Sequence, residues 1–250
     1  MQRITVGGKI ICIFMVKDKQ GFTVHKDLLA LHSGYFRNRF RDAEEDEKFE
    51  LQDFKAATFA DFHAWLYSGI FLDAKDLVTS MSSQETWALG SFLKAPAYQN
   101  HCMDLMRNDF RSHYGTTRDY KRVLIEDIES AYNHTSKGSL LRVFMVDLVC
   151  SKDVWGTLPK GSTEQKEWEA LSENNTDFKR DTLTRLPQPW LGTFPWDEQY
   201  REGYLEDEER LDETWEKLIL ASRSLSDIEE AARTGEVKSI IELAHLRGNK

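Results

Sequence analysis

The most constraining feature of this sequence is a change in the spacing of its apolar residues at His25. Residues 9–16 (KIICIFMV) form a short apolar run rich in β-branched side chains, and the polar segment 17–21 follows it. This pattern predicts a β-hairpin whose second strand begins at Phe22-Thr23-Val24. From His25 the apolar residues recur every three to four positions, which predicts one helix with a buried face. The chain therefore passes directly from a strand into a helix.

The next segments predict a short strand and a second amphipathic helix. The stripe of the first helix is Leu28, Leu29, Leu31 or His32, Tyr35, Phe36 and Phe40. An acidic connector, 41–48, precedes Phe49-Glu50-Leu51, where apolar and polar residues alternate as in a short strand. We expect Thr58 to cap a helix and Gly69 to end it. The stripe of that helix is Phe59, Phe62, Trp65 and Leu66.

Helical spacing dominates the rest of the chain. It predicts helices over 85–93, 96–110, 119–132 and 139–150, with Pro96 in a first turn. The expected buried face of 96–110 consists of Tyr98, Cys102, Leu105 and Met106. Segments 156–163 and 186–196 have the proline and glycine residues of loops, although their tryptophans are expected to pack. Near the C-terminus, an apolar stripe over 211–219, a capping box at 226–229 and a stripe over 237–244 predict three more helices.

The charge argues against nucleic acid as a partner. Lys and Arg total 33 and Asp and Glu total 42, so the net charge is −9, the wrong sign for binding a phosphate backbone. Residues 197–217 alone contain ten acidic residues and three basic ones. We therefore expect protein partners, no direct nucleic acid and no membrane, because the apolar run 10–16 is too short to span a bilayer.

The cysteines suggest neither a disulfide framework nor a metal site. Cys12, Cys102 and Cys150 are few and widely separated, so we expect reduced, buried thiols in a cytoplasmic or nuclear protein. His101 and Cys102 are adjacent, which on a helix directs them about 100° apart, so they would not readily share a metal. No catalytic residue, cofactor or metal is predicted.

The familiar enzyme motifs are absent from the sequence. It contains no phosphate-binding loop, no GxSxG, no HExxH, no dinucleotide fingerprint and no EF-hand loop. His25 with Asp27, near the exposed carboxylates of the connector, makes a poor acid–base cluster, because such carboxylates are not desolvated. One enzyme hypothesis stays open: the tryptophans of the C-terminal half could line a ligand cleft. These are Trp155, Trp168, Trp190 and Trp196.

Several motifs together resemble the BTB/POZ domain, especially the divergent form widespread in filamentous fungi. They are Phe22-Thr23-Val24-His25-Lys26, Leu28-Leu29, Ser33-Gly34-Tyr35-Phe36, Phe40, Phe49-Glu50-Leu51, Phe59, Trp65-Leu66-Tyr67-Ser68-Gly69, Leu89, Leu93, Ala95 and Gln99-Asn100. The resemblance implies an α+β BTB/POZ-like domain at 8–112, with a small sheet flanked by clustered helices. A mainly α-helical C-terminal region, 113–250, would follow it. Residues 132–147 resemble the helical segment that commonly trails such domains.

The resemblance also implies where partners bind. Members of this family associate with themselves and with other proteins, and some are substrate adaptors of cullin-type ubiquitin ligases. Our interaction candidates are the helix residues Tyr35, Phe36 and Phe40 and the connector residues Ala43, Glu44 and Glu45. Adaptors usually place a large apolar residue two positions before a glutamate. Ala43 forfeits about 1–2 kcal/mol of transfer energy there, so cullin binding is expected to be about tenfold weaker or more.

The leading hypothesis is a non-enzymatic protein-interaction module that acts as a scaffold or adaptor. A homodimer and a cullin are both open as partners, and the first alternative is a cullin-type ligase adaptor. The second alternative is an enzyme of unrecognised type in the C-terminal half. The acidic residue often found at the start of the family's first strand is replaced around Ile10 and Ile11, so a charged pocket at Lys26 is not expected. A transcription factor is disfavoured because no zinc finger or basic DNA-reading segment is present.

Overall fold

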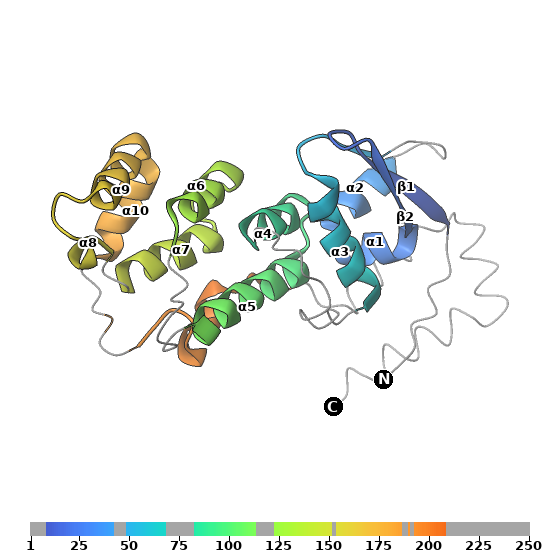
Figure 1. Cartoon of the computed structure of the whole chain (residues 1–250). Helices are drawn as coiled ribbons and strands as arrows, with labels where there is room; N and C mark the ends of the chain where they lie inside the picture. Colours follow the sequence, from blue (N-terminus) through green and yellow to red (C-terminus); the bar gives the residue numbers. More distant parts are fainter. Residues whose placement is uncertain are drawn as a thin grey trace, which may run out of the picture.

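The computed structural model describes residues 9–42, 49–68, 83–113, 123–151, 154–186, 190 and 193–208. The strands are β1 (Ile10–Met15), β2 (Gln20–His25) and β3 (Phe49–Leu51). The helices are α1 (Lys26–His32), α2 (Gly34–Asp42), α3 (Ala56–Ser68), α4 (Ser83–Phe92), α5 (Pro96–His113), α6 (Ile125–His134), α7 (Leu140–Ser151), α8 (Val154–Thr157), α9 (Thr163–Asn174), α10 (Thr176–Arg185) and the 3₁₀ helix η1 (Glu198–Tyr204). The sheet with α1–α3 lies at one end of the molecule and α9 and α10 at the other (Figure 1).

The sheet confirms the predicted hairpin and short strand. Its order is β2-β1-β3, with β1 antiparallel to β2 and parallel to β3. Ile13 and Met15 of β1 have no exposed surface, whereas Cys12, the residue before Ile13, is exposed. The expectation that all three thiols are buried is therefore wrong for Cys12, because alternate residues of a strand point to opposite faces.

The predicted single helix after His25 is two helices, because the chain breaks at Ser33. Ser33 adopts an extended conformation, and its hydroxyl donates a 2.7 Å hydrogen bond to the Leu93 carbonyl. The Phe36 amide then donates to the same hydroxyl oxygen at 3.3 Å, as at a helix N-cap. The amide of Gly34 donates to the Lys94 carbonyl at 3.0 Å. The break thus docks the start of α2 on the end of α4.

The start of α3 also differs from the prediction. Thr58 lies inside the helix, and the Asp18 carboxylate from the hairpin turn accepts a hydrogen bond from the Ala56 amide. The carboxylate thus supplies the capping interaction that we had assigned to the threonine. The stripe itself is confirmed, because Phe59 and Phe62 are fully buried and Trp65 is 9% exposed.

The buried face of α5 is rotated relative to the prediction. Pro96 is the first helical residue, as expected, and Tyr98, Cys102 and Met106 are buried. Leu105, however, is 38% exposed. The buried face includes the polar residue Arg107, so apolar spacing alone placed its centre wrongly. Gln99, Asn100 and Met103 are also buried on this helix.

The second half of the described chain is helical, and α8, α9, α10 and η1 lie outside the predicted helical ranges. Helix α9 begins at Ser162, whose hydroxyl accepts from the Gln165 amide at 3.1 Å. Helix α10 begins at Asn175, whose side chain accepts from the Phe178 amide at 3.0 Å. Trp168 and Phe178 place these helices on the same hydrophobic cluster as the sheet.

A set of charged contacts around the buried Arg107 ties segment 193–208 to α5, and we call it the α5–η1 clasp. Arg107 is 4% exposed and donates to the Trp196 and Asp197 carbonyls at 3.1 and 3.0 Å. Asp104 accepts from Arg107 at 3.0 Å and from both ends of the Arg201 guanidinium at 2.9 and 2.7 Å. Figure 1 shows this segment, in orange, returning alongside α5. The clasp therefore joins parts of the chain about 90 residues apart.

Some predictions fall outside the described residues. They concern Gly69, the side chain of Trp155 and the three helices expected after residue 208. Segments 156–163 and 186–196 are mostly turns and irregular structure where they are described, and Trp196 is buried in the core. Among the described residues, no helix combines the length and apolar character needed to cross a bilayer.

Candidate functional site

Six aromatic rings form a continuous row across α2, α4 and the chain around β3. The rings belong to Phe54, Phe92, Tyr35, Phe36, Phe40 and Phe49, in that order. Centroids of neighbouring rings are 4.9 to 5.8 Å apart, the range in which aromatic pairs attract one another. We call this set the aromatic row.

The row is buried at Phe36 and Phe49 and reaches the surface near its other end, at Phe92. Phe36 has no exposed surface and Phe49 is 7% exposed, so these rings belong to the core. Tyr35 and Phe40 are partly buried, whereas Phe92 is 39% exposed. The row therefore presents a rigidly supported ring to solvent.

The surroundings of the aromatic row carry charges of both signs. The Lys26 ammonium lies 5.1 Å from the centroid of the Phe40 ring, within the range of a cation–π contact. The exposed cations Arg39 and Lys55 are sequence neighbours of Phe40 and Phe54, and Lys55 pairs with Glu85 at 3.5 Å. The exposed acidic residues Glu50 and Asp53 are likewise neighbours of Phe49 and Phe54.

The structure brings together three of the six residues predicted to bind partners. Tyr35, Phe36 and Phe40 share α2 and the aromatic row, although Phe36 offers no surface to a partner in this arrangement. The connector candidates Ala43, Glu44 and Glu45 lie outside the described residues.

Sequence reasoning missed Phe54 and Phe92, which complete the exposed end of the row. Phe54 is an isolated aromatic after a three-residue strand, and Phe92 ends a helix whose other apolar residues face the core. Neither residue belongs to a periodic stripe. The contact between these two rings depends on tertiary packing. The only sign of it in the sequence is that both are apolar residues outside the predicted apolar stripes.

Two potentially reactive side chains of α5, Cys102 and His101, are poorly placed for catalysis. Burial raises the pKa of the Cys102 thiol to about 12, so it stays protonated and weakly nucleophilic at neutral pH. Burial lowers the pKa of His101 to about 4, and this imidazole is therefore neutral. Within the described part of the chain, no group of three or more His, Cys, Asp or Glu side chains could hold a metal ion.

The tryptophans that could have lined a ligand cleft are mostly packing residues where the structure describes them. Trp168 and Trp196 are 2% and 3% exposed, and both belong to the continuous hydrophobic core. Trp190 is partly buried, with its ring centroid 5.1 Å from that of Tyr200. These positions provide no open tryptophan-lined cleft.

Comparison with known proteins agrees with this fold. Residues 12–109 match the family model of the BTB/POZ domain. The N-terminal part of this chain is a BTB/POZ domain. BTB/POZ domains are protein–protein interaction modules, and the whole aromatic row lies within the matched residues. The expected fold class, an α+β BTB/POZ domain followed by a mainly helical region, is confirmed. No curated protein matches the chain.

Proposed function

We propose that this chain is a non-enzymatic scaffold or adaptor that binds protein partners through the aromatic row of its BTB/POZ domain. The observation that carries the proposal is the Phe92 ring, which is 39% exposed and packs on Tyr35 at 4.9 Å. An exposed aromatic ring held by a packed neighbour is pre-ordered, so it loses little conformational freedom when a partner covers it.

Other parts of the proposal concern the setting of this surface. We place the domain boundary at 112/113, with 8–112 as the BTB/POZ domain and 113–250 as the C-terminal region. We also assign the domain to the divergent type widespread in filamentous fungi, and the protein to the cytoplasm or nucleus. The connector residues Ala43, Glu44 and Glu45 follow α2 directly in sequence, and we retain them with Tyr35 and Phe40 as partner contacts.

The test compares substitutions at two apolar residues whose side chains are almost equally exposed. Phe92→Asp alters the aromatic row, whereas Leu105→Asp changes an apolar side chain of α5 that is 38% exposed. Proximity labelling in cells and affinity purification should lose specific partners with Phe92→Asp and keep them with Leu105→Asp. Recovery of the same partners by both variants would contradict the role of the row. A wild-type chain with no stable partner that stays monomeric in light scattering at every concentration would contradict the whole proposal.

Cullin adaptation is the narrower alternative, and it has its own test. Titration with a cullin amino-terminal domain should show binding in the micromolar range if the chain is a ligase adaptor. Glu45→Lys should abolish that binding, with an unrelated exposed site, Glu173→Lys, as the charge-matched control. If no cullin binding occurs, general scaffolding or self-association is favoured.

A further inference from the structure

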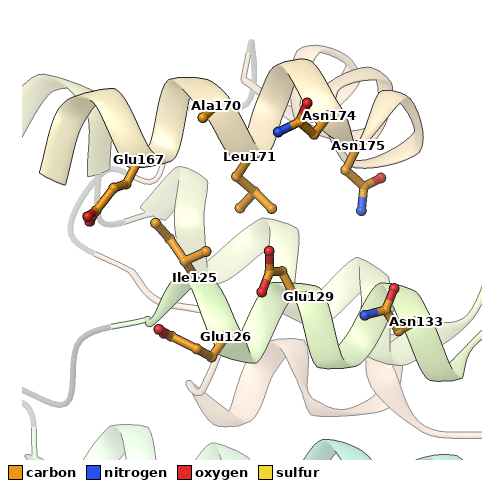
Figure 2. Close-up of a pocket in the computed structure, with 9 residues that line it drawn as sticks. All are labelled: Ile125, Glu126, Glu129, Asn133, Glu167, Ala170, Leu171, Asn174 and Asn175. Atoms are coloured by element: carbon orange, nitrogen blue, oxygen red, sulfur yellow. The ribbon is translucent and has the colours of Figure 1, made fainter. Parts of the chain in front are cut away.

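A groove lies between α6 and α9, in the helical region outside the matched domain. Its volume is about 480 Å³, which falls in the range of roughly 300–1,000 Å³ typical of ligand sites. Figure 2 shows Ile125 and Glu129 of α6 and Leu171 of α9 pointing into the space between the two helices. Leu171 is 6% exposed and Ile125 is partly buried, so the groove has an apolar floor.

The sides of the groove are acidic and carry amides. Glu126 and Glu129 on α6 and Glu167 on α9 contribute three exposed carboxylates. Asn133 and Asn174 lie farther along the same two helices, so the carboxylates and amides occupy different ends. No lysine or arginine is among the described residues that line the groove. The charged side chains that line the groove are therefore all acidic.

The carboxylates do not converge as metal ligands do. No group of three or more His, Cys, Asp or Glu side chains in the described part of the chain could hold a metal ion. A metal ion needs oxygen ligands within about 2.0–2.6 Å, whereas carboxylates spread along a groove suit larger cationic groups at hydrogen-bond distance. The amides add donors and acceptors of the kind that pair with a peptide backbone.

We infer that this groove binds an extended basic segment of a partner protein. One lysine or arginine side chain of the segment pairs with Glu129 and another with Glu167, and an apolar neighbour in the segment covers Leu171. Asn133 and Asn174 hydrogen-bond to the backbone of the segment. The chain thereby has two interaction surfaces, one in the BTB/POZ domain and one in the helical region.

The probe for the test is a fluorescein-labelled peptide of about eight residues that repeats Gly-Lys-Leu-Lys. Its fluorescence anisotropy is measured against the full chain, beside a peptide with glutamate in place of lysine. Glu167→Lys should weaken binding of the basic peptide about tenfold, because it places a cation beside the peptide's own. The matched control is Glu173→Lys, an exposed residue of the same helix that does not line the groove, and it should change the affinity less than about twofold.

Four results would overturn the inference. Equal weakening by the two substitutions would mean that the peptide responds only to overall charge. Equal binding of the glutamate peptide would mean that only apolar contact matters. No saturable binding of the basic peptide up to about 1 mM would leave the groove without this occupant. A dimer of the chain that Glu167→Lys dissociates would assign the groove to a second copy. The groove lies outside residues 12–109. A negative result in the peptide-binding test is therefore distinguishable from a negative result in the Phe92→Asp test.

Discussion

Replacing Arg107 with methionine tests whether the α5–η1 clasp stabilises the fold. Methionine keeps an unbranched apolar stem but removes the guanidinium that donates to the Trp196 and Asp197 carbonyls. Each buried carbonyl left without a donor costs about 1–3 kcal/mol. Asp104 is partly exposed and keeps its ion pair with Arg201, so losing its contact with Arg107 adds little to this cost. For the two carbonyls together, one of them only partly buried, we expect the free energy of unfolding to fall by about 2–5 kcal/mol.

The assay is urea denaturation followed by circular dichroism and tryptophan fluorescence. With a denaturant dependence of about 3 kcal/mol per molar, the midpoint of unfolding should fall by roughly 1–2 M. Arg111→Met is the matched control, because Arg111 lies one turn farther along the same helix and is exposed. If Arg107→Met lies within about 0.5 kcal/mol of Arg111→Met, the clasp contributes nothing and the reasoning is refuted.

Three further predictions concern the core and its titration. Phe36→Ala should cost about 3–5 kcal/mol in urea denaturation because the ring is fully buried, whereas Phe92→Ala should cost about 1 kcal/mol or less. Gly90→Ala should lower the melting temperature, because a Cβ there would lie 2.8 Å from a glutamine side chain of α5, and Gly203→Ala, with open space around it, should not. Burial raises the pKa of Asp147, so wild-type stability should fall as pH rises above the ordinary value of 3.8, and Asp147→Asn should flatten that dependence in denaturation at several pH values. A parallel pH dependence for this variant and the wild type would mean that the carboxyl contributes no linkage.

Local pattern was sufficient to predict much of the BTB/POZ domain. The period change at His25 follows from the geometry of strands and helices, and both Phe22-Thr23-Val24 and Trp65 lie where it predicts. The break at Ser33 could not be predicted in this way. It depends on a hydrogen bond to the Leu93 carbonyl, 60 residues away in sequence, which exists only after α2 meets α4.

The helices α9 and α10 could have been predicted from their caps, although their surfaces are mostly polar. Ser162 and Gln165 have the spacing of a capping box, and the Gln165 side chain accepts from the Gly161 amide at 2.6 Å. Apolar spacing alone gives a weak signal here because only Trp168 and Leu171 are buried along α9. Cap residues are therefore more informative than the hydrophobic stripe for helices that touch the core at only one or two points.

The aromatic row and the α5–η1 clasp show why the candidate site was only half predictable. Tyr35 and Phe40 belong to a periodic stripe, whereas Phe92 gains its role from the fold that sets it against Tyr35. Arg107 is a charged residue on the buried face of α5. The carbonyls that it binds belong to a segment about 90 residues later in the chain. A charged residue within an apolar stripe is costly to bury without partners. Its presence is thus a sequence-level sign that another part of the chain returns to cover it.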